Sequence, residues 1–320
     1  MKAAIVRTAE HPPVFGEYPD PVEVQCEVIV RVAASALSHL TRSRAAGRYY
    51  SSAADLDSVP GVDGVGRLPD GRRMYFIFPS APFGAMGQLS RVKENQCVSV
   101  PDEVDDVTMA AIAIPAMSSW AALTKRAKIL PGETVLINGA TGASGKLAVQ
   151  IAKWLGAGKV IATGRNESEL ASLTKFGADV LISLQQSEQD FVSSLRGETN
   201  DVKVVLDYLW GRSAQQIIAT LAGRENEGFG ERTRFVQIGS LSGPDISLPS
   251  AVFRSSSLEI LGSGQGSLSN HDMVKAIAAA ALAIVPAHLH IETDAVPLED
   301  VEATWTQTDP HRRRVYVLRS

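Results

Sequence analysis

Residues 135–154 constrain the fold more than any other stretch, because a short apolar run leads into a glycine-rich turn and then into a helical pattern. The apolar run predicts a buried strand, and apolar residues then recur every four positions from Leu147, which predicts a helix. A strand, glycine loop and helix in this order suit a dinucleotide, since Gly142 lets backbone approach the pyrophosphate and Gly145 lets the helix pack closely. The candidate cofactor-binding loop consists of Ala140, Thr141, Gly142, Ala143, Ser144 and Gly145.

The next predicted strand supports a dinucleotide site. The pattern G-x-x-G-x-x-G alone does not establish one, because a turn between a strand and a helix can also bind nothing. Residues 159–163 form this strand, and Gly164, Arg165 and Asn166 follow it. An NAD site carries Asp or Glu here, about 20 residues past the glycines, to accept from the ribose 2′-hydroxyl. Glycine instead leaves space for a 2′-phosphate, and Arg165 offers it a planar, permanently charged donor group. The sequence therefore predicts NADPH, although two glutamates follow closely and Arg165 is also compatible with a solvated turn.

Strands and helices alternate from this region to about residue 265, which predicts a parallel sheet with right-handed crossovers. The helix after Asn270 continues the alternation, with apolar residues at a spacing of four. The predicted strands of this sheet are 134–138, 159–163, 180–183, 202–207, 234–239 and 258–263.

The first part of the chain is instead rich in strand patterns and turn signals and lacks any βαβ rhythm. A helix is expected over 110–123, interrupted at Pro115, and the strand expected at 315–318 should rejoin the first part. The predicted fold is therefore α/β, with a β-rich substrate domain and an inserted doubly wound parallel-sheet domain. The β-rich domain is expected to comprise residues 1–115 and 286–320, and the inserted domain residues 116–285.

The composition limits which partners the chain is expected to bind and indicates the compartment in which it is expected to work. A net charge of −4 over 320 residues gives no general attraction to nucleic acid or to anionic membranes. The basic cluster at 312–314 is expected to be a solvated turn, and the apolar stretch at 276–285 is too short to cross a bilayer. Only Cys26 and Cys97 occur, in no metal-ligand spacing, which favours a reducing, cytoplasmic compartment and no metal site.

Further motifs follow in order along nearly the whole chain. They are Met1-Lys-Ala-Ala4, Glu27-Val-Ile-Val-Arg-Val-Ala-Ala34, Val59-Pro-Gly-Val-Asp-Gly-Val-Gly66, Leu130-Pro-Gly-Glu-Thr-Val-Leu136, the glycine loop, Phe176-Gly-Ala-Asp179 and Val236-Gln-Ile-Gly239. This ordered set resembles the medium-chain dehydrogenase/reductase superfamily, in its zinc-free quinone oxidoreductase-like branch. The resemblance implies a GroES-like substrate domain with an inserted Rossmann domain and NADPH in the cleft between them. It also implies a homodimer formed through the edges of the Rossmann sheets, with the strand at 258–263 as the candidate edge.

The departures from the family are informative. Zinc-dependent members carry Cys and Gly-His-Glu where this chain has Ser38 and Gly61-Val62-Asp63, so no metal is predicted. A lysine and a tyrosine that some relatives use on the 2′-phosphate align with Glu169 and Leu184. Arg165 would therefore bind that phosphate with less help.

Without a metal, the substrate's own conjugation must accept the hydride, which favours a quinone or an α,β-unsaturated carbonyl. Charge then develops on the carbonyl oxygen, where hydrogen-bond donors lower the barrier. The resemblance implies Tyr49 as the first candidate donor, with Ser38 and Tyr50 behind it, although Tyr49 is equally compatible with an exposed loop aromatic. On the cofactor side it implies backbone groups near the nicotinamide, at Gly239, Ser240, Gly262 and Ser263.

Three functions remain open at this stage. The favoured one is an NADPH-dependent, zinc-independent oxidoreductase acting on quinones or activated alkenes. A zinc-free aldehyde or alcohol oxidoreductase is disfavoured because nothing obvious would polarise an isolated carbonyl. A non-catalytic NADPH-binding protein is also compatible, since a fold does not fix a function.

Overall fold

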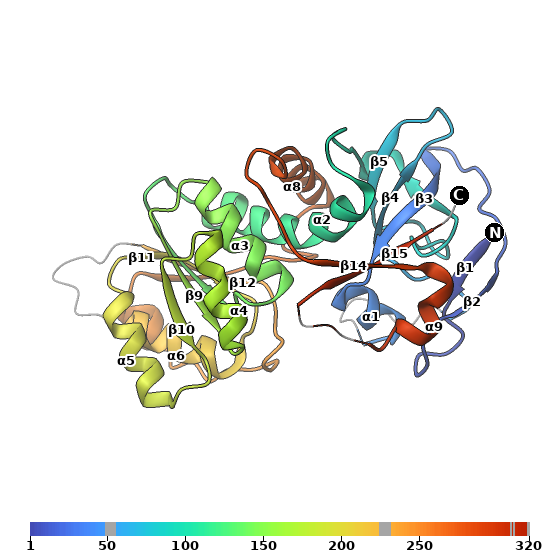
Figure 1. Ribbon diagram of the computed structural model, residues 1–320. Helices are drawn as coiled ribbons and strands as arrows, with labels where there is room; N and C mark the ends of the chain where they lie inside the picture. Colours follow the sequence, from blue (N-terminus) through green and yellow to red (C-terminus); the bar gives the residue numbers. More distant parts are fainter. Residues whose placement is uncertain (49–55, 224–231, 308, 310, 319–320) are drawn as a thin grey trace. The chain divides into compact units, whose positions relative to one another are not determined.

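The computed structural model describes residues 1–48, 56–223, 232–307, 309 and 311–318 (Figure 1). The chain forms two compact units. Unit 1 comprises Met1–Ile114 and Val274–Ser320, and unit 2 comprises Pro115–Met273. The second boundary lies inside helix α8 (Asn270–Ala283), earlier than the limit at 286 that the sequence suggested.

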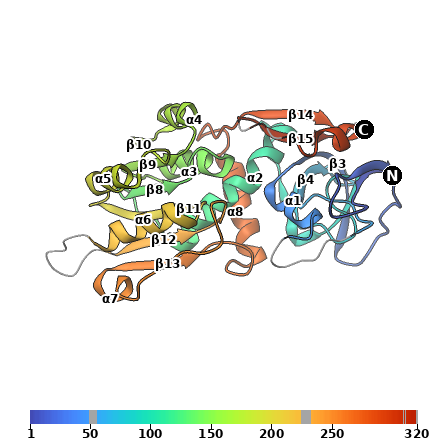
Figure 2. The same cartoon turned by 90° about the horizontal axis from the view of Figure 1, so that it is seen from below.

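Unit 2 is built on a parallel sheet of six strands, which Figure 2 shows in succession. The predicted doubly wound α/β architecture is therefore confirmed, and each of the six predicted strands is present to within two residues at either end. The strand order reverses its direction of growth between β8 and β11, and ligands of such sheets bind at the carboxyl edge beside this reversal. In spatial order the strands are β10 (Val180–Ser183), β9 (Lys159–Gly164), β8 (Thr134–Asn138), β11 (Val202–Asp207), β12 (Thr233–Gln237) and β13 (Leu258–Gly262).

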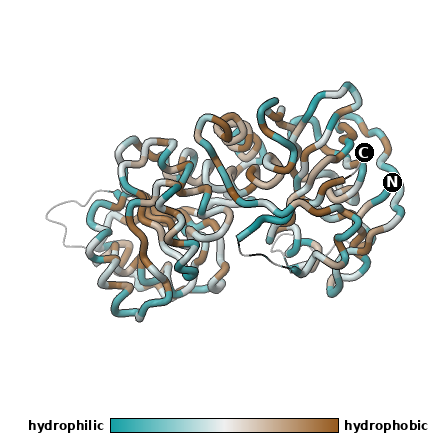
Figure 3. The backbone as a smooth tube through the Cα atoms, viewed as in Figure 1, coloured by the Kyte–Doolittle hydropathy of each residue, from teal (hydrophilic) through white to brown (hydrophobic). Residues whose placement is uncertain are grey.

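Helices cover this sheet because its strands are mostly apolar and buried, and Figure 3 shows brown, hydrophobic stretches of the backbone in the interior of this unit. The side chains of Leu136, Val205 and Phe235 are fully buried in one core cluster. Each such side chain contributes roughly 1.5–3 kcal/mol to folding. The crossover helices and short turns are α3 (Ala143–Trp154), α4 (Glu167–Ser172), η3 (Leu173–Phe176), α5 (Glu188–Glu198), α6 (Gly211–Ala222) and α7 (Val252–Ser255).

Unit 1 is dominated by a mainly antiparallel sheet in which strands from both ends of the chain meet. The last strand, β15, pairs antiparallel with β3, so the end of the chain returns to the β-rich N-terminal part. In spatial order this sheet contains β14 (Thr293–Pro297), β15 (Arg313–Val317), β3 (Glu27–Ala36), β4 (Asp63–Arg67), β5 (Arg73–Ile77) and β7 (Cys97–Ser99). The remaining elements are β6 (Leu89–Lys93) on β3, the hairpin β1 (Lys2–Ile5) and β2 (Val14–Glu17), α1 (His39–Ala45), η1 (Glu94–Gln96), η4 (Leu298–Asp300) and α9 (Val301–Thr304).

Two expectations about secondary structure are wrong. Helix α2 (Asp106–Ala121) begins earlier than expected and continues through Pro115 into the π-helical turn η2 (Ala122–Ala127). The early start follows from Asp105, whose carboxylate accepts hydrogen bonds from the backbone and hydroxyl of Thr108.

By length and composition the run Asp106–Ala127 could cross a membrane, but 67% of its most apolar window is buried, as in the core helix of a soluble protein.

The basic cluster at 312–314 is not a solvated turn either, because Arg313 and Arg314 lie in β15. The guanidinium of Arg314 donates to Asp294 at 2.7 Å and to the Thr304 carbonyl at 2.7 Å. These partners come from neighbouring elements that only the folded sheet brings together.

Candidate functional site

The glycine loop between β8 and α3 is closed by protein at both ends and open in the middle. A Cβ on Gly145 would lie 2.3 Å from the Gly139 carbonyl oxygen, so only glycine fits there. Gly139 has a φ of +89°, a conformation that glycine adopts without strain. A Cβ on Gly142 would meet no protein atom within 4 Å. The two ends of the loop therefore pack tightly against neighbouring residues, whereas the space beside Gly142 is open.

That open space lies at the N-terminus of α3, where Gly142 is the N-cap residue and makes no side-chain cap. The first backbone N–H groups of a helix have no intrahelical acceptor, and the helix dipole adds positive charge there. Lys146 is the first residue whose N–H is satisfied in the helix, by the Gly142 carbonyl at 2.8 Å. The groups of Ala143, Ser144 and Gly145 are thus placed to bind an anion such as a pyrophosphate.

A polar ladder, formed by the buried side chains of Thr163, Asn138 and Asp207, connects the loop to the ends of three strands. The Ala140 N–H donates to the Thr163 carbonyl at 2.8 Å, and the Thr163 hydroxyl donates to Asn138 Oδ1 at 2.8 Å. The Asn138 amide then donates to Asp207 Oδ1 at 2.8 Å. Burial raises the pKa of Asp207, whose carboxylate also accepts the backbone N–H of Trp210. Three adjacent strands are thus tied together where each one ends.

Sequence reasoning missed Asn138, Thr163 and Asp207. A usable signal was present, because a polar residue ends, or nearly ends, each of three mostly apolar strands. A second missed cluster lies beside the loop. The Ser119 hydroxyl lies 2.8 Å from the Tyr208 hydroxyl and 3.1 Å from the Ser144 carbonyl oxygen, and burial raises the pKa of Tyr208 to about 12.

The end of β9 differs from expectation in one respect. The space beside Gly164 is not left free, because a Cβ there would lie 2.4 Å from the Thr141 methyl group. Glycine is required so that the loop threonine can pack against the strand. Arg165 is exposed, and within the described residues its guanidinium makes no hydrogen bond or ion pair. Asn166 caps α4, since its side-chain oxygen accepts the Glu169 N–H at 3.1 Å.

The predicted nicotinamide-side residues lie at or just after the ends of β12 and β13, at the same carboxyl edge of the sheet. The Gly239 N–H donates to the Asp207 carbonyl at 3.1 Å, and the Ser263 N–H donates to the Gln237 carbonyl at 2.9 Å. Ser240 and Gly262 are exposed. The structure thus brings the predicted cofactor-binding residues of unit 2 to one edge of one sheet.

The candidate donors of unit 1 are less well defined. Ser38 is buried and caps α1, where its hydroxyl oxygen accepts the Thr41 N–H at 2.9 Å and lies 2.9 Å from the Thr41 hydroxyl. Its hydrogen-bonding capacity is therefore largely used within the protein. Tyr49 and Tyr50 lie outside the described residues. The roles of all three in catalysis stay predictions.

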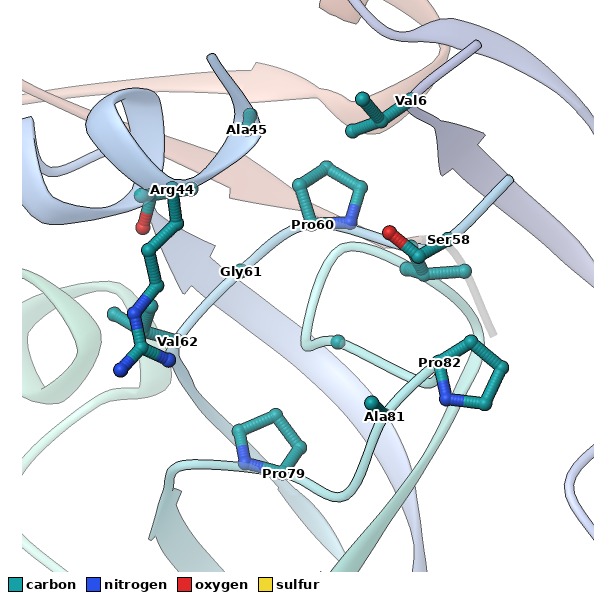
Figure 4. A pocket seen from close by; sticks show the side chains of 13 residues that line it. Val6, Arg44, Ala45, Ser58, Pro60, Gly61, Val62, Pro79, Ala81 and Pro82 are labelled. Atoms are coloured by element: carbon teal, nitrogen blue, oxygen red, sulfur yellow. The ribbon is translucent and has the colours of Figure 1, made fainter. Parts of the chain in front are cut away.

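Unit 1 also contains a hollow of about 100 Å³ beside α1 (Figure 4). Figure 4 shows the Arg44 side chain extending past Val62 at one side, with Pro79 and Pro82 on the facing loop. The Arg44 guanidinium lies 5.5 Å from the centre of the Phe78 ring. The hollow is therefore lined by polar and apolar groups alike, with one cation at its border.

Asp63, the residue after Val62 in the sequence, is fully buried and receives a hydrogen bond from the Tyr75 hydroxyl at 3.0 Å. Burial raises the pKa of Asp63 to about 7, against the opposing effects of Arg313 and Tyr75. Its Oδ1, together with Nε and Nη2 of Arg313, is buried without a hydrogen-bond partner in the described part of the chain. The hydrogen bond from Tyr75 thus offsets only part of the free-energy cost of burying this carboxyl group.

The positions that correspond to zinc ligands in the family resembled do not suit a metal. Ser38 and Val62 present a capping hydroxyl and an isopropyl group in place of a thiolate and an imidazole. Over the described residues, no group of three or more His, Cys, Asp or Glu is arranged to hold a metal ion.

Comparisons with known proteins agree with this geometry. A family model described as "Zinc-binding dehydrogenase" matches residues 143–281. The chain is 27% identical over 360 aligned residues to the probable NADPH-dependent quinone reductase tdiC of Emericella nidulans, covering 99% of this chain and 100% of that protein. A partial match, at 28% identity over 173 residues, joins 49% of the chain to 44% of the 2-methylene-furan-3-one reductase of Solanum lycopersicum.

Two solved structures share the fold along the whole chain. The quinone oxidoreductase of Thermus thermophilus, solved also in complex with NADPH, has a TM-score of 0.81 at 23% identity, with 100% of both chains covered. A 2-haloacrylate reductase has a TM-score of 0.84 at 21% identity, again with 100% of both chains covered.

Proposed function

We propose that this chain, which belongs to the medium-chain dehydrogenase/reductase superfamily and is quinone oxidoreductase-like, transfers hydride from NADPH to quinones or α,β-unsaturated carbonyls without a metal. The observation that carries the proposal is the glycine loop at the reversal point of the parallel sheet. Its open face at Gly142 adjoins the unpaired N–H groups of α3. This arrangement binds the pyrophosphate of a dinucleotide.

The cofactor is NADPH, as the sequence predicts. The full-length relative from Emericella nidulans is described as NADPH-dependent, and the Thermus thermophilus neighbour was solved with NADPH. The residues present fit this cofactor, since Arg165 follows β9 with its guanidinium unengaged and no carboxylate occupies the position of Gly164. When bound, NADPH supplies a hydride from C4 of its nicotinamide.

The chain's own residues then have three tasks: to hold the cofactor, to orient the substrate and to stabilise negative charge on the substrate oxygen. Backbone groups near Gly239, Ser240, Gly262 and Ser263 are proposed to position the nicotinamide. Tyr49, Ser38 and Tyr50 remain the proposed donors to the substrate oxygen, and Tyr49 is the first of these to test. One lost donor in such a site typically lowers the rate by about 10²-fold or more.

A conjugated substrate is proposed because the zinc-ligand positions offer nothing that would polarise an isolated carbonyl. The comparisons support this class, since the relatives include a quinone reductase and a 2-methylene-furan-3-one reductase, and the structural neighbours a 2-haloacrylate reductase. A quinone, a methylene furanone and an acrylate share a carbon that is conjugated to a carbonyl group. Hydride reaches that carbon while the carbonyl oxygen takes up the charge.

The test follows NADPH oxidation against a benzoquinone, a naphthoquinone, an enone and a saturated aldehyde, each with and without a chelator. Turnover of the quinones or the enone, unaffected by the chelator, is expected. Turnover of the aldehyde alone would support the aldehyde oxidoreductase, and NADPH binding without any turnover would support the non-catalytic protein. A Tyr49→Phe variant with unchanged turnover on every acceptor would remove that tyrosine from the mechanism.

We also propose a cytoplasmic homodimer that pairs through the edges of its Rossmann sheets. Strand β13 is an edge strand of the six-stranded sheet, and an edge offers unpaired backbone groups to a second copy. Light scattering on the eluting protein is expected to give twice the chain mass of 34.1 kDa. Disruption of the dimer by a proline at Glu259, within β13, would support this edge over other surfaces.

A further inference from the structure

We propose that the ion pair between Lys146 and Glu169 sets the preference for a 2′-phosphate, because Lys146 cancels a carboxylate that would otherwise repel that phosphate. The inference rests on the proposed function, since it concerns the adenosine end of the NADPH site. It assigns a role to a lysine that neither the glycine pattern nor the end of β9 singled out.

The two partners come from the two helices that border the site. Lys146 lies in the first turn of α3, directly after the last glycine of the loop, and its ammonium group forms an ion pair with the Glu169 carboxylate. Glu169 lies in the first turn of α4, three residues past the Asn166 cap. Both side chains are largely buried, with 11% of Lys146 and 14% of Glu169 exposed. The charges are thus held in place and only weakly screened by solvent.

The pair lies beside the end of β9, where a 2′-phosphate is recognised in this fold. A Cβ on Gly164 would contact Leu170, the neighbour of Glu169 in α4, at 3.4 Å. Gly164 also packs against Thr141 of the glycine loop. The loop that precedes Lys146 and the helix that carries Glu169 therefore both border Gly164, the residue before Arg165.

Charge counting shows why the lysine matters. The end of β9 and the start of α4 carry one cation, Arg165, and two carboxylates, Glu167 and Glu169. This local sum is −1, which disfavours a phosphate. Adding Lys146 from the neighbouring helix brings the sum to zero and removes the buried carboxylate's field, so that Arg165 can attract the phosphate. The remaining carboxylate, Glu167, is exposed and is screened by water.

The experiment uses two nucleotide probes that differ only in the 2′-phosphate: adenosine 2′,5′-bisphosphate and adenosine 5′-monophosphate. Isothermal titration of the full chain gives the ratio of their affinities without any turnover. In Lys146→Met the ratio is expected to fall about tenfold in favour of the monophosphate, because the Glu169 carboxylate loses this cation. In Glu169→Gln it is expected to rise, because Lys146 becomes available to the phosphate. The double variant is expected to return close to the original ratio.

A matched control exists on the same helix. Lys153 of α3 forms an ion pair with Asp179 at 2.7 Å, seven residues further along and away from the glycine loop. Lys153→Met and Asp179→Asn remove equivalent charges, and both are expected to leave the ratio unchanged. Thermal unfolding of every variant shows whether it is folded under the titration conditions.

The outcomes separate this inference from the function on which it rests. Failure of the unsubstituted protein to prefer the bisphosphate would overturn the assignment of NADPH, and this inference with it. A preference in the unsubstituted protein that neither Lys146→Met nor Glu169→Gln changes would overturn only the role of the ion pair. Should Lys146→Met prove unfolded, Glu169→Gln decides alone, because an unchanged ratio there also overturns the proposal.

Discussion

Replacing Asp63 by asparagine is expected to remove a pH dependence from the stability of unit 1. The carboxyl group is fully buried, and its burial raises its pKa from 3.8 to about 7. Because the pKa is raised in the folded state, the folded protein holds a proton that the unfolded chain releases between about pH 4 and pH 7. The stabilisation is complete below pH 4 and is lost as the pH rises through 7.

The magnitude follows from the size of this shift. About three pH units at 1.36 kcal/mol each correspond to about 4 kcal/mol. The free energy of unfolding of the unsubstituted protein, minus that of Asp63→Asn, should therefore fall by about 4 kcal/mol between pH 4 and pH 8. Asparagine is nearly isosteric and cannot ionise, so the subtraction removes the other titrating groups to first order.

Unit 1 can be followed by itself because of where the tryptophans lie. Trp305 is buried in the core of unit 1, whereas Trp120, Trp154 and Trp210 belong to unit 2. Replacing these three by phenylalanine leaves Trp305 as the fluorescent reporter of unit 1 in urea unfolding. A difference that stays constant within about 0.5 kcal/mol from pH 4 to pH 8 would refute the reasoning, since Asp63 would then titrate normally.

Three further predictions concern positions whose surroundings are defined in the structure. Gly145→Ala should weaken NADPH binding at least tenfold in a fluorescence titration, because the new methyl group would lie 2.3 Å from a backbone oxygen. The control is Gly197→Ala in α5, which should leave binding unchanged because a methyl group there meets no atom within 4 Å. Equal binding by the two variants would contradict this. Asn138→Ala should lower the free energy of unfolding by about 1–3 kcal/mol, because buried Asp207 Oδ1 loses the hydrogen bond from the Asn138 amide. An unchanged urea unfolding curve would show that water replaces that donor. Ser38→Ala should cost about 1 kcal/mol by the Trp305 reporter, as the loss of a helix N-cap does, and unaltered stability would mean that this cap is dispensable.

The sequence was sufficient to predict the sheet of unit 2 but not the packing of its ends. Parallel strands buried on both faces are continuous apolar runs, so β8 and β11 could be placed from local pattern alone. The pairing of Asn138 with Asp207 joins residues 69 positions apart. Such a contact depends on which strands become neighbours, and no local pattern states this.

Unit 1 was harder to predict for the same physical reason. Nε and Nη2 of Arg313 are buried because β15 lies between β14 and β3 in the sheet, whereas a run of arginines ordinarily indicates solvent. Helix α2 was misjudged because Pro115 indicates a break, yet the helix tolerates it and the hydroxyls of Ser118 and Ser119 donate to its carbonyl. The expected clearance beside Gly164 failed because Thr141 reaches it from another element.

The polar ladder under the glycine loop means that the shape of the loop is encoded largely outside the loop. Thr163, Asn138 and Asp207 fix the ends of three strands, and the loop backbone at Ala140 is attached to the first of these residues. These hydrogen bonds hold the loop in shape although Ala140 stands where the dinucleotide-binding pattern usually has its first glycine. A transplant of residues 139–145 into another parallel sheet would carry the glycines but not the template that shapes them. The geometry of the nucleotide site in this protein is therefore a property of three neighbouring strands and the loop together.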